Sequence, residues 1–87
     1  MRVVKKDDRR EDFDKEKVRR AIERAAERAD IDKDNAKEIA EKIARDIENK
    51  FRDRDEVRSA DIRDSVLEAL NRDERRIADS FRTYKKE

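Results

Sequence analysis

The sequence lacks both cysteine and histidine over its 87 residues. Without cysteine the chain cannot form a disulfide, a thiolate metal site or a thiol nucleophile. Without histidine it lacks the commonest general base and the commonest metal ligand of proteins. No nucleophile is spaced with a partner base, and no glycine-rich loop occurs. These absences argue against an enzyme, and we predict no catalytic residues and no metal-ligating set.

Glycine and proline are also absent. At average usage of about 7% and 5%, a chain of this length would hold roughly ten of the two together. Tryptophan is missing as well, and the residues that remain are largely strong helix formers. This bias favours the hypothesis of a designed or redesigned sequence. A natural but strongly biased sequence is the alternative.

Long hydrophobic runs are missing too. No apolar stretch approaches the roughly 18 residues that a membrane span needs, and no signal-peptide pattern occurs. The 26 basic and 25 acidic residues nearly cancel, which argues against binding to nucleic acid or to a membrane surface. The pairs Arg9-Arg10, Arg19-Arg20 and Arg75-Arg76 have acidic residues between and around them. We therefore expect a cytoplasmic protein without a nucleic-acid or membrane partner.

Hydrophobic residues make up only 33% of the chain, and compositions of this kind often remain disordered. Apolar residues nevertheless recur at helical spacing, which a disordered chain has no reason to keep. The length suits one small domain over residues 1–87. Because many of the apolar positions are alanine, we expect a thin core and self-association into a homo-oligomer.

The amino-terminal residues predict a β-hairpin. Residues 2–5 and 9–13 alternate in the manner of strands, and Asp7-Asp8 lies between them as a two-residue turn. Aspartate tolerates the positive φ of such turns, although glycine would fit the second position better. An isolated hairpin is marginally stable, so it must lie on the rest of the molecule.

Two helices are predicted to follow. Asp14 is a good N-cap for a helix over residues 15–29, and Phe13 can pack back onto its first turn. The next helix starts near Asp32 or Asp34. Its apolar stripe is the strongest in the chain and comprises Ala36, Ile39, Ala40, Ile43, Ala44, Ile47 and Phe51.

The second half of the chain predicts a strand and two further helices. Val57 and its neighbours form a short strand, and Ser59 is a natural N-cap for the helix that follows. We expect that helix to end at Asn71 and the last helix to start at Asp73. The predicted fold is therefore mostly α: a four-helix bundle capped by a small three-stranded sheet. The sheet consists of the N-terminal hairpin and the short strand before the third helix.

Several lysines and arginines are candidates for a polyphosphate site, because a triphosphate needs several converging cations. On composition alone, a solvated charged face is the preferred interpretation, since some of 26 cations will gather by accident. The acidic residues of positions 7–14 lack the spacing of a calcium loop and are interpreted as solvated charges. The candidate cations are Lys5, Lys6, Lys17, Arg63, Lys85 and Lys86.

Three blocks of sequence share a pattern with a known family. The first reads Val3-Val4-Lys5-Lys6-Asp7-Asp8, followed by Glu11, Phe13, Asp14 and Lys17. The second is Ser59-Ala60-Asp61-Ile62-Arg63, and the third is Phe81-Arg82-Thr83-Tyr84-Lys85. In order and spacing they closely resemble the ATP-cone domain, the nucleotide-binding regulatory module of ribonucleotide reductases and of the repressor of their genes.

The resemblance implies a non-catalytic domain that binds ATP or dATP, with Mg²⁺ arriving on the nucleotide. The cleft would lie between the sheet and the helices. The base would lie on Val3, Val4 and Ile62, and Glu11 and Asp14 would accept hydrogen bonds from the adenine amino edge. In the family, nucleotide occupancy is coupled to oligomeric state.

The resemblance also implies a place for the sugar and the phosphates. Ser59 would lie near the ribose, and Lys17 would lie near the phosphates. The residues implied to hold the phosphates are Lys5, Lys6, Arg63 and Lys86.

Two positions depart from the family pattern. Asp8 replaces the usual turn glycine and adds a negative charge beside the phosphate-binding segment. Lys6 replaces the usual arginine and loses its two-pronged geometry. Both changes weaken the phosphate site. They keep open the alternative of a designed or redesigned helical scaffold that retains the fold but has no ligand-binding function.

Overall fold

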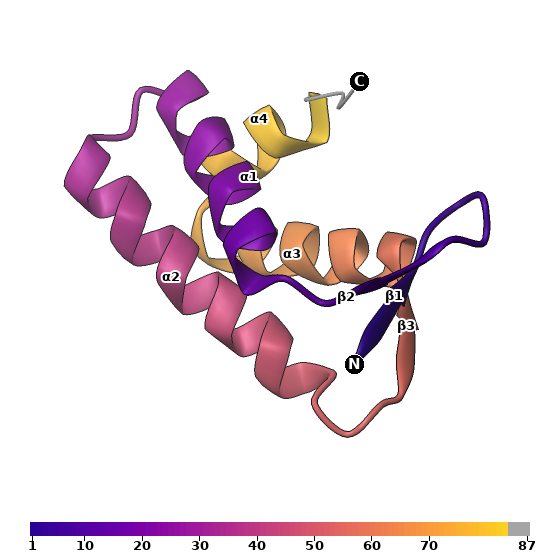
Figure 1. Cartoon of the computed structure of the whole chain (residues 1–87). Coiled ribbons are helices and arrows are strands. Elements are labelled where there is room, and N and C mark those ends of the chain that lie inside the picture. The colour runs from indigo at the N-terminus through magenta and orange to yellow at the C-terminus, as the bar shows by residue number, and fades with distance from the viewer. Residues whose placement is uncertain (84–87) are drawn as a thin grey trace.

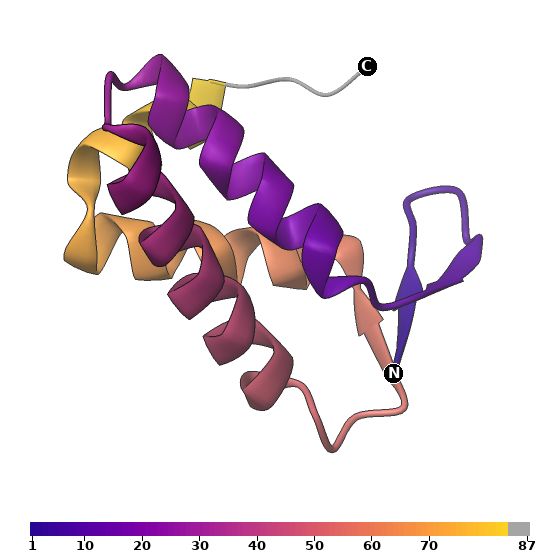
Figure 2. The same cartoon turned by 60° about the vertical axis from the view of Figure 1, so that its left-hand side comes forward.

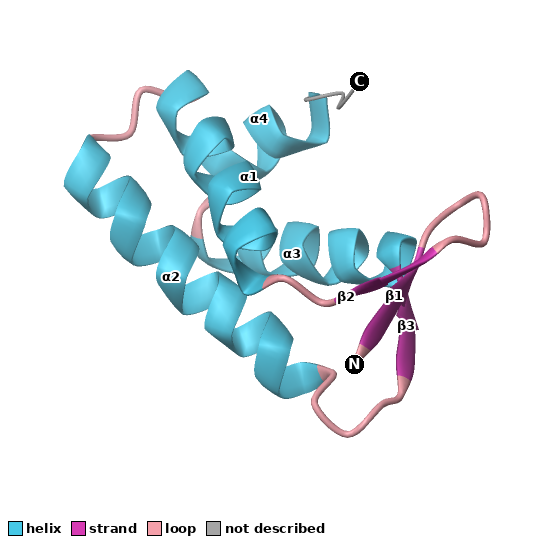
Figure 3. Cartoon of the chain, in the orientation of Figure 1, coloured by secondary structure: helices cyan, strands magenta, loops and turns pink. Residues whose placement is uncertain are grey.

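The computed structural model describes residues 1–83, and in them the predicted class of fold is confirmed. Four helices and a small three-stranded sheet make up this described part of the chain (Figure 3). The elements are β1 (Arg2–Val4), β2 (Arg10–Asp12), α1 (Lys15–Arg28), α2 (Lys33–Lys50), β3 (Glu56–Arg58), α3 (Ser59–Asp73) and α4 (Arg75–Thr83).

Aspartate caps start the first two helices, as predicted. The backbone N–H of Glu16 donates to Asp14 Oδ1 over 2.9 Å at the start of α1. At the start of α2, Asp32 accepts from the backbone N–H groups of Asp34 and Asn35, each over 3.3 Å. These side chains satisfy donors that have no partner inside the helix, so the caps fix where each helix begins.

The predicted limits of α3 and α4 need correction. Ser59 is the first residue of α3 rather than its cap, because β3 runs directly into the helix and Arg58 occupies the cap position without a side-chain bond. Asn71 does not end the helix: the backbone stays helical up to Asp73, and Asn71 Oδ1 accepts from Arg82 of α4 over 3.3 Å. The last helix consequently starts at Arg75 and not at Asp73.

The sheet has the order β2-β1-β3, with β1 in the middle. β1 pairs antiparallel with β2, so that Val3 lies opposite Glu11, and parallel with β3, so that Val3 also lies opposite Val57. The hairpin turn is longer than predicted. Lys5 N–H donates to Arg9 O over 2.8 Å and Asp8 N–H to Lys5 O over 3.0 Å, which leaves three residues in the loop rather than two. Such loops place their last residue in the left-handed region, and Asp8 has φ 67°.

The sheet lies at one end of the helices. In Figure 1 it stands beside the first turns of α1 and α3, and α2 lies on the far side of α1. Helix α1 packs on α2 and α4, and α3 packs on α4 and α2. Figure 2 shows that the β1–β2 loop extends away from the rest of the chain, while β2 leads back to the start of α1 and β3 leads into α3.

The core is thin, as the alanine-rich stripes predict. Ile22, Leu70 and Ile77 are the largest fully buried side chains, and five of the eight buried residues of α1 and α2 are alanine. Small side chains let two helices approach closely but bury little apolar area each. No large hydrophobic side chain of residues 1–83 is exposed.

Two backbone positions invite glycine. Asp8 has φ 67° in the hairpin loop, and Asp30 has φ 60° where α1 ends, with Ile31 N–H donating back to Ala26 O over 3.0 Å. Left-handed backbone is costly for residues with a Cβ. We expect Asp8→Gly and Asp30→Gly each to raise the free energy of unfolding by about 0.5–1 kcal/mol. Urea denaturation measures the change. Asp8→Ala is the control and should lower stability, because alanine tolerates positive φ less well than aspartate.

Candidate functional site

An open cavity of about 360 Å³ lies where the hairpin meets the first turns of α1 and α3. Its size falls in the range of small-molecule sites, roughly 300–1,000 Å³. The hairpin supplies one wall, α1 a second and α3 a third, and Phe81 of α4 closes one side. Residues of the first two sequence blocks and Phe81 of the third therefore lie around one hollow. The predicted site residues that line it are Val3, Lys5, Lys6, Glu11, Asp14, Lys17, Ser59, Ile62 and Arg63.

Two predicted site residues are not among those that line the cavity. Val4 follows Val3 along β1, and successive strand residues point to opposite faces of a sheet, so Val4 faces away from the cavity when Val3 faces it. Lys86 lies outside the residues that the structure describes, as does the further candidate cation Lys85.

The sequence analysis missed several lining residues, most of them apolar. Phe13 was interpreted only as a packing residue and Phe81 only as part of a motif, yet both line the cavity, as does Val18 of α1. Ala60 could have been predicted as a lining residue, because it directly follows Ser59 in the second sequence block. The missed residues are Asp12, Phe13, Val18, Ala21, Ala60, Val66 and Phe81.

The floor of the cavity is apolar and rests on the core. Val3 and Ile62 are buried members of the core cluster, and Val66 and Phe81 extend it. Because a flat ring that lies on such a surface removes one of its faces and the apolar floor from water, this floor suits an aromatic or heterocyclic group.

One carboxylate of the cavity is shared by two lysines. Glu11 projects from β2, and its Oε1 lies 3.8 Å from Lys5 Nζ and 3.5 Å from Lys17 Nζ. Lys5 follows β1 and Lys17 belongs to the first turn of α1, so Glu11 links the hairpin to the helix. The lysines are thereby held at the rim of the apolar floor.

Two further cations of the cavity have no carboxylate partner. Within residues 1–83, neither Lys6 nor Arg63 forms an ion pair. The Arg63 guanidinium lies over the Phe81 ring, 5.2 Å from its centre, which is the geometry of a cation–π contact. Four cations thus face three carboxylates in the cavity lining. Lys6 and Arg63, which form no ion pair within residues 1–83, are therefore available to bind an anion.

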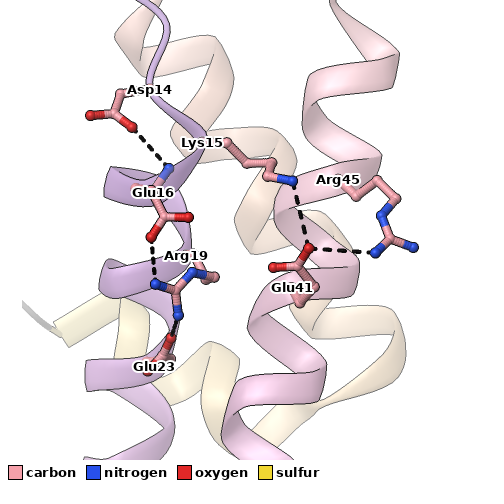
Figure 4. A network of polar contacts seen from close by, with 7 residues as sticks. All are labelled: Asp14, Lys15, Glu16, Arg19, Glu23, Glu41 and Arg45. Carbon is pink, nitrogen blue, oxygen red and sulfur yellow. Dashed lines mark hydrogen bonds and ion pairs between the residues drawn. The ribbon is translucent and has the colours of Figure 1, made fainter.

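The first turn of α1 is fixed by charge pairs (Figure 4). Beyond the Asp14 cap, Arg19 bridges Glu16 and Glu23 along α1. Lys15 reaches across to Glu41 of α2 over 3.5 Å, and Arg45 lies 3.4 Å from the same Glu41 oxygen. These contacts connect the first turns of α1 to α2, and as partly exposed ion pairs they each contribute little to stability.

The Glu16–Arg19 pair predicts a pH dependence. The hydrogen bond from Arg19 lowers the pKa of the Glu16 carboxyl below its ordinary value of 4.5. A carboxyl with a lowered pKa stabilises the fold above its unfolded pKa, and the contribution is lost as pH falls through the folded pKa. We expect Glu16→Gln to melt below the parent at neutral pH and the gap to close toward pH ~2. Thermal melts across this range measure it. Glu38→Gln, which removes an exposed carboxylate outside the ion pairs of residues 1–83, should keep a constant offset.

Asp7 in the hairpin loop is engaged by the neighbouring Arg9. Asp7 accepts from the Arg9 backbone and side chain, and these bonds lower the pKa of the Asp7 carboxyl. Within residues 1–83, no group of three or more acidic side chains is placed to hold a metal ion. Over the same residues, the helices are too short or too polar for a bilayer crossing.

The fold and the cavity define a class: a small helical domain in which a mixed three-stranded sheet and two helix starts enclose an apolar floor with a cationic rim. The family model of the ATP cone domain matches residues 1–87. The chain therefore belongs to the ATP-cone family, whose members are nucleotide-binding regulatory domains without catalytic activity. No curated protein and no solved structure matched the chain.

Proposed function

We propose that this chain is a single regulatory domain that binds ATP or dATP in the cavity and catalyses no reaction. One observation carries the proposal: residues from all three sequence blocks surround the same hollow, with an apolar floor beside several cations. An adenine nucleotide suits this arrangement. Its base is flat and largely apolar, like the floor, and its triphosphate is strongly anionic, opposite in charge to the cations.

The base is placed on the floor formed by Val3 and Ile62. There the carboxylates of Glu11 and Asp14 accept hydrogen bonds from the adenine amino group. Asp14 keeps Oδ2 for this purpose, since its Oδ1 accepts from Glu16 N–H. Guanine carries a carbonyl in place of that amino group and would leave the carboxylates unpaired there, which costs binding energy.

The sugar and the phosphates extend toward the rim. Ser59 lies beside the ribose, and Lys17 stands near the phosphates. Mg²⁺ arrives with the nucleotide and is held through the phosphates. The residues assigned to the phosphates are Lys5, Lys6, Arg63 and Lys86.

Regulation is proposed to act through self-association into a homo-oligomer. Because no large hydrophobic side chain of residues 1–83 is exposed, the contact would be made by polar and half-buried side chains. Such an interface is sensitive to a change of charge nearby, and a bound triphosphate is a change of that kind. Sedimentation with and without ATP measures this step.

Calorimetric titration with ATP, dATP and GTP tests the binding site. We expect heat from ATP and from dATP at a stoichiometry of at least one nucleotide per chain, and none from GTP at the same concentrations. Failure of all three nucleotides at millimolar concentration would remove the proposal.

The alternative of a helical scaffold without ligand is favoured by Asp8, which stands in the left-handed position of the hairpin loop. A scaffold of this kind predicts a melting temperature that ATP leaves unchanged. A true ligand at a hundred times its Kd would instead add about 2.7 kcal/mol to the stability of the fold. A thermal shift with and without ATP separates the two functions.

A further inference from the structure

Glu11 pairs with two lysines of the cavity at once. Both ammonium groups of Lys5 and Lys17 lie against the same oxygen, Oε1, rather than one on each oxygen of the carboxylate. The three side chains come from three different segments, the end of β1, the strand β2 and the first turn of α1. Glu11 is therefore the anion that the two lysines face.

A phosphate that enters the cavity competes with Glu11 for these lysines. When the lysines turn to the phosphate, the carboxylate is left beside a like charge and loses both of its partners. An ionised carboxylate can only accept hydrogen bonds, so it needs a donor in return. The Glu11 side chain is 33% exposed, and water replaces the lost partners only in part.

A ligand that carries a base with an amino group can supply that donor. Glu11 then loses its two lysine partners and gains hydrogen bonds from the amino group of the base. The lysines lose Glu11 and gain the phosphates. Asp14 cannot make this exchange of lysines for the amino group. One of its oxygens caps α1, and within residues 1–83 neither oxygen forms an ion pair with a cavity lysine.

We infer that Glu11 couples recognition of the base to recognition of the phosphates and so determines specificity against polyphosphates that lack a base. The inference deepens the proposed function and rests on it for the identity of the base. Independently of the base, Glu11 weakens the binding of bare polyphosphate because it occupies Lys5 and Lys17.

Calorimetric titration of the whole chain with inorganic tripolyphosphate and with ATP, at one fixed ionic strength, tests the inference. The variant is Glu11→Gln. The matched control is Glu56→Gln, which makes the same change in net charge on the same sheet. Glu56 pairs with Arg10 over 2.6 Å and does not line the cavity. Removal of one negative charge a few ångströms from the phosphates predicts about tenfold tighter binding of tripolyphosphate to Glu11→Gln than to Glu56→Gln.

ATP behaves differently from tripolyphosphate in the same variant. The gain at the phosphates is offset by the loss of the carboxylate acceptor, so the preference for ATP over tripolyphosphate falls by about tenfold or more relative to the control. Glu11→Ala repeats the comparison without a side-chain amide, which in glutamine could itself donate to a phosphate. Circular dichroism confirms that each variant is folded.

The outcomes separate this inference from the proposed function. If wild type does not bind ATP, the proposed function fails, and the tripolyphosphate comparison alone then decides the role of Glu11. A tenfold gain over the control supports the competition with the lysines. Equal affinities of Glu11→Gln, Glu11→Ala and Glu56→Gln for tripolyphosphate would overturn it, whether or not ATP binds.

Discussion

Replacing Ala60 by tryptophan is expected to abolish ATP binding while the fold remains intact. Ala60 lies in the first turn of α3, lines the cavity and is exposed rather than part of the core. An indole ring is close in size to adenine, so at this position it fills the space that the base needs. We expect the Kd for ATP to rise at least a hundredfold, which corresponds to about 2.7 kcal/mol.

Calorimetry measures the loss of binding, and thermal melting in the absence of ligand measures the fold. Ala60→Ser is the matched control, because it changes the same position with little change in volume and should bind ATP within a few-fold of the parent. Undiminished ATP binding by Ala60→Trp, with a melting temperature close to the parent, would show that the nucleotide binds elsewhere.

The second large effect is on stability. Leu70 of α3 is fully buried in the core, and its truncation to alanine leaves a cavity among well-packed neighbours. Substitutions of this kind cost about 2.7–5 kcal/mol. Small domains unfold with a total free energy of about 5–15 kcal/mol, and a thin core places this chain toward the lower end. We therefore expect Leu70→Ala to be partly unfolded at 37 °C.

Chemical denaturation of Leu70→Ala measures the loss of stability. Leu67→Ala is the matched control, since it makes the same substitution in the same helix at a side chain that is only partly buried. It should cost well under half as much. Equal losses in the two variants would mean that α3 is not packed as the structure places it.

The caps and the apolar stripes made most of the fold predictable. Asp14 and Asp32 fix the starts of α1 and α2 by bonds within a few residues, so a local pattern is sufficient to find them. The candidate site residues were selected for a different reason. Lys5, Glu11 and Lys17 could be selected from the many charged residues only because their order resembles the ATP-cone domain.

The parts that could not be predicted depend on contacts that are distant in sequence. Asn71 resembles a helix end locally, but its side chain bonds to Arg82 of α4 and the helix continues. Val18 and Val66 belong to regular apolar stripes. They line a cavity only because the hairpin lies next to α1 and α3. Spacing along a helix cannot reveal that choice.

The central place of β1 has a consequence for how the protein is made. Val3 pairs with Val57, so β1 must wait for α1 and α2 to be synthesised before its parallel neighbour β3 exists. Parallel pairings across such a length of chain form slowly. We therefore expect the nucleotide site to be assembled late in biosynthesis, after the α1–α2 hairpin of helices has formed, and a nascent chain released before β3 to be unable to bind nucleotide.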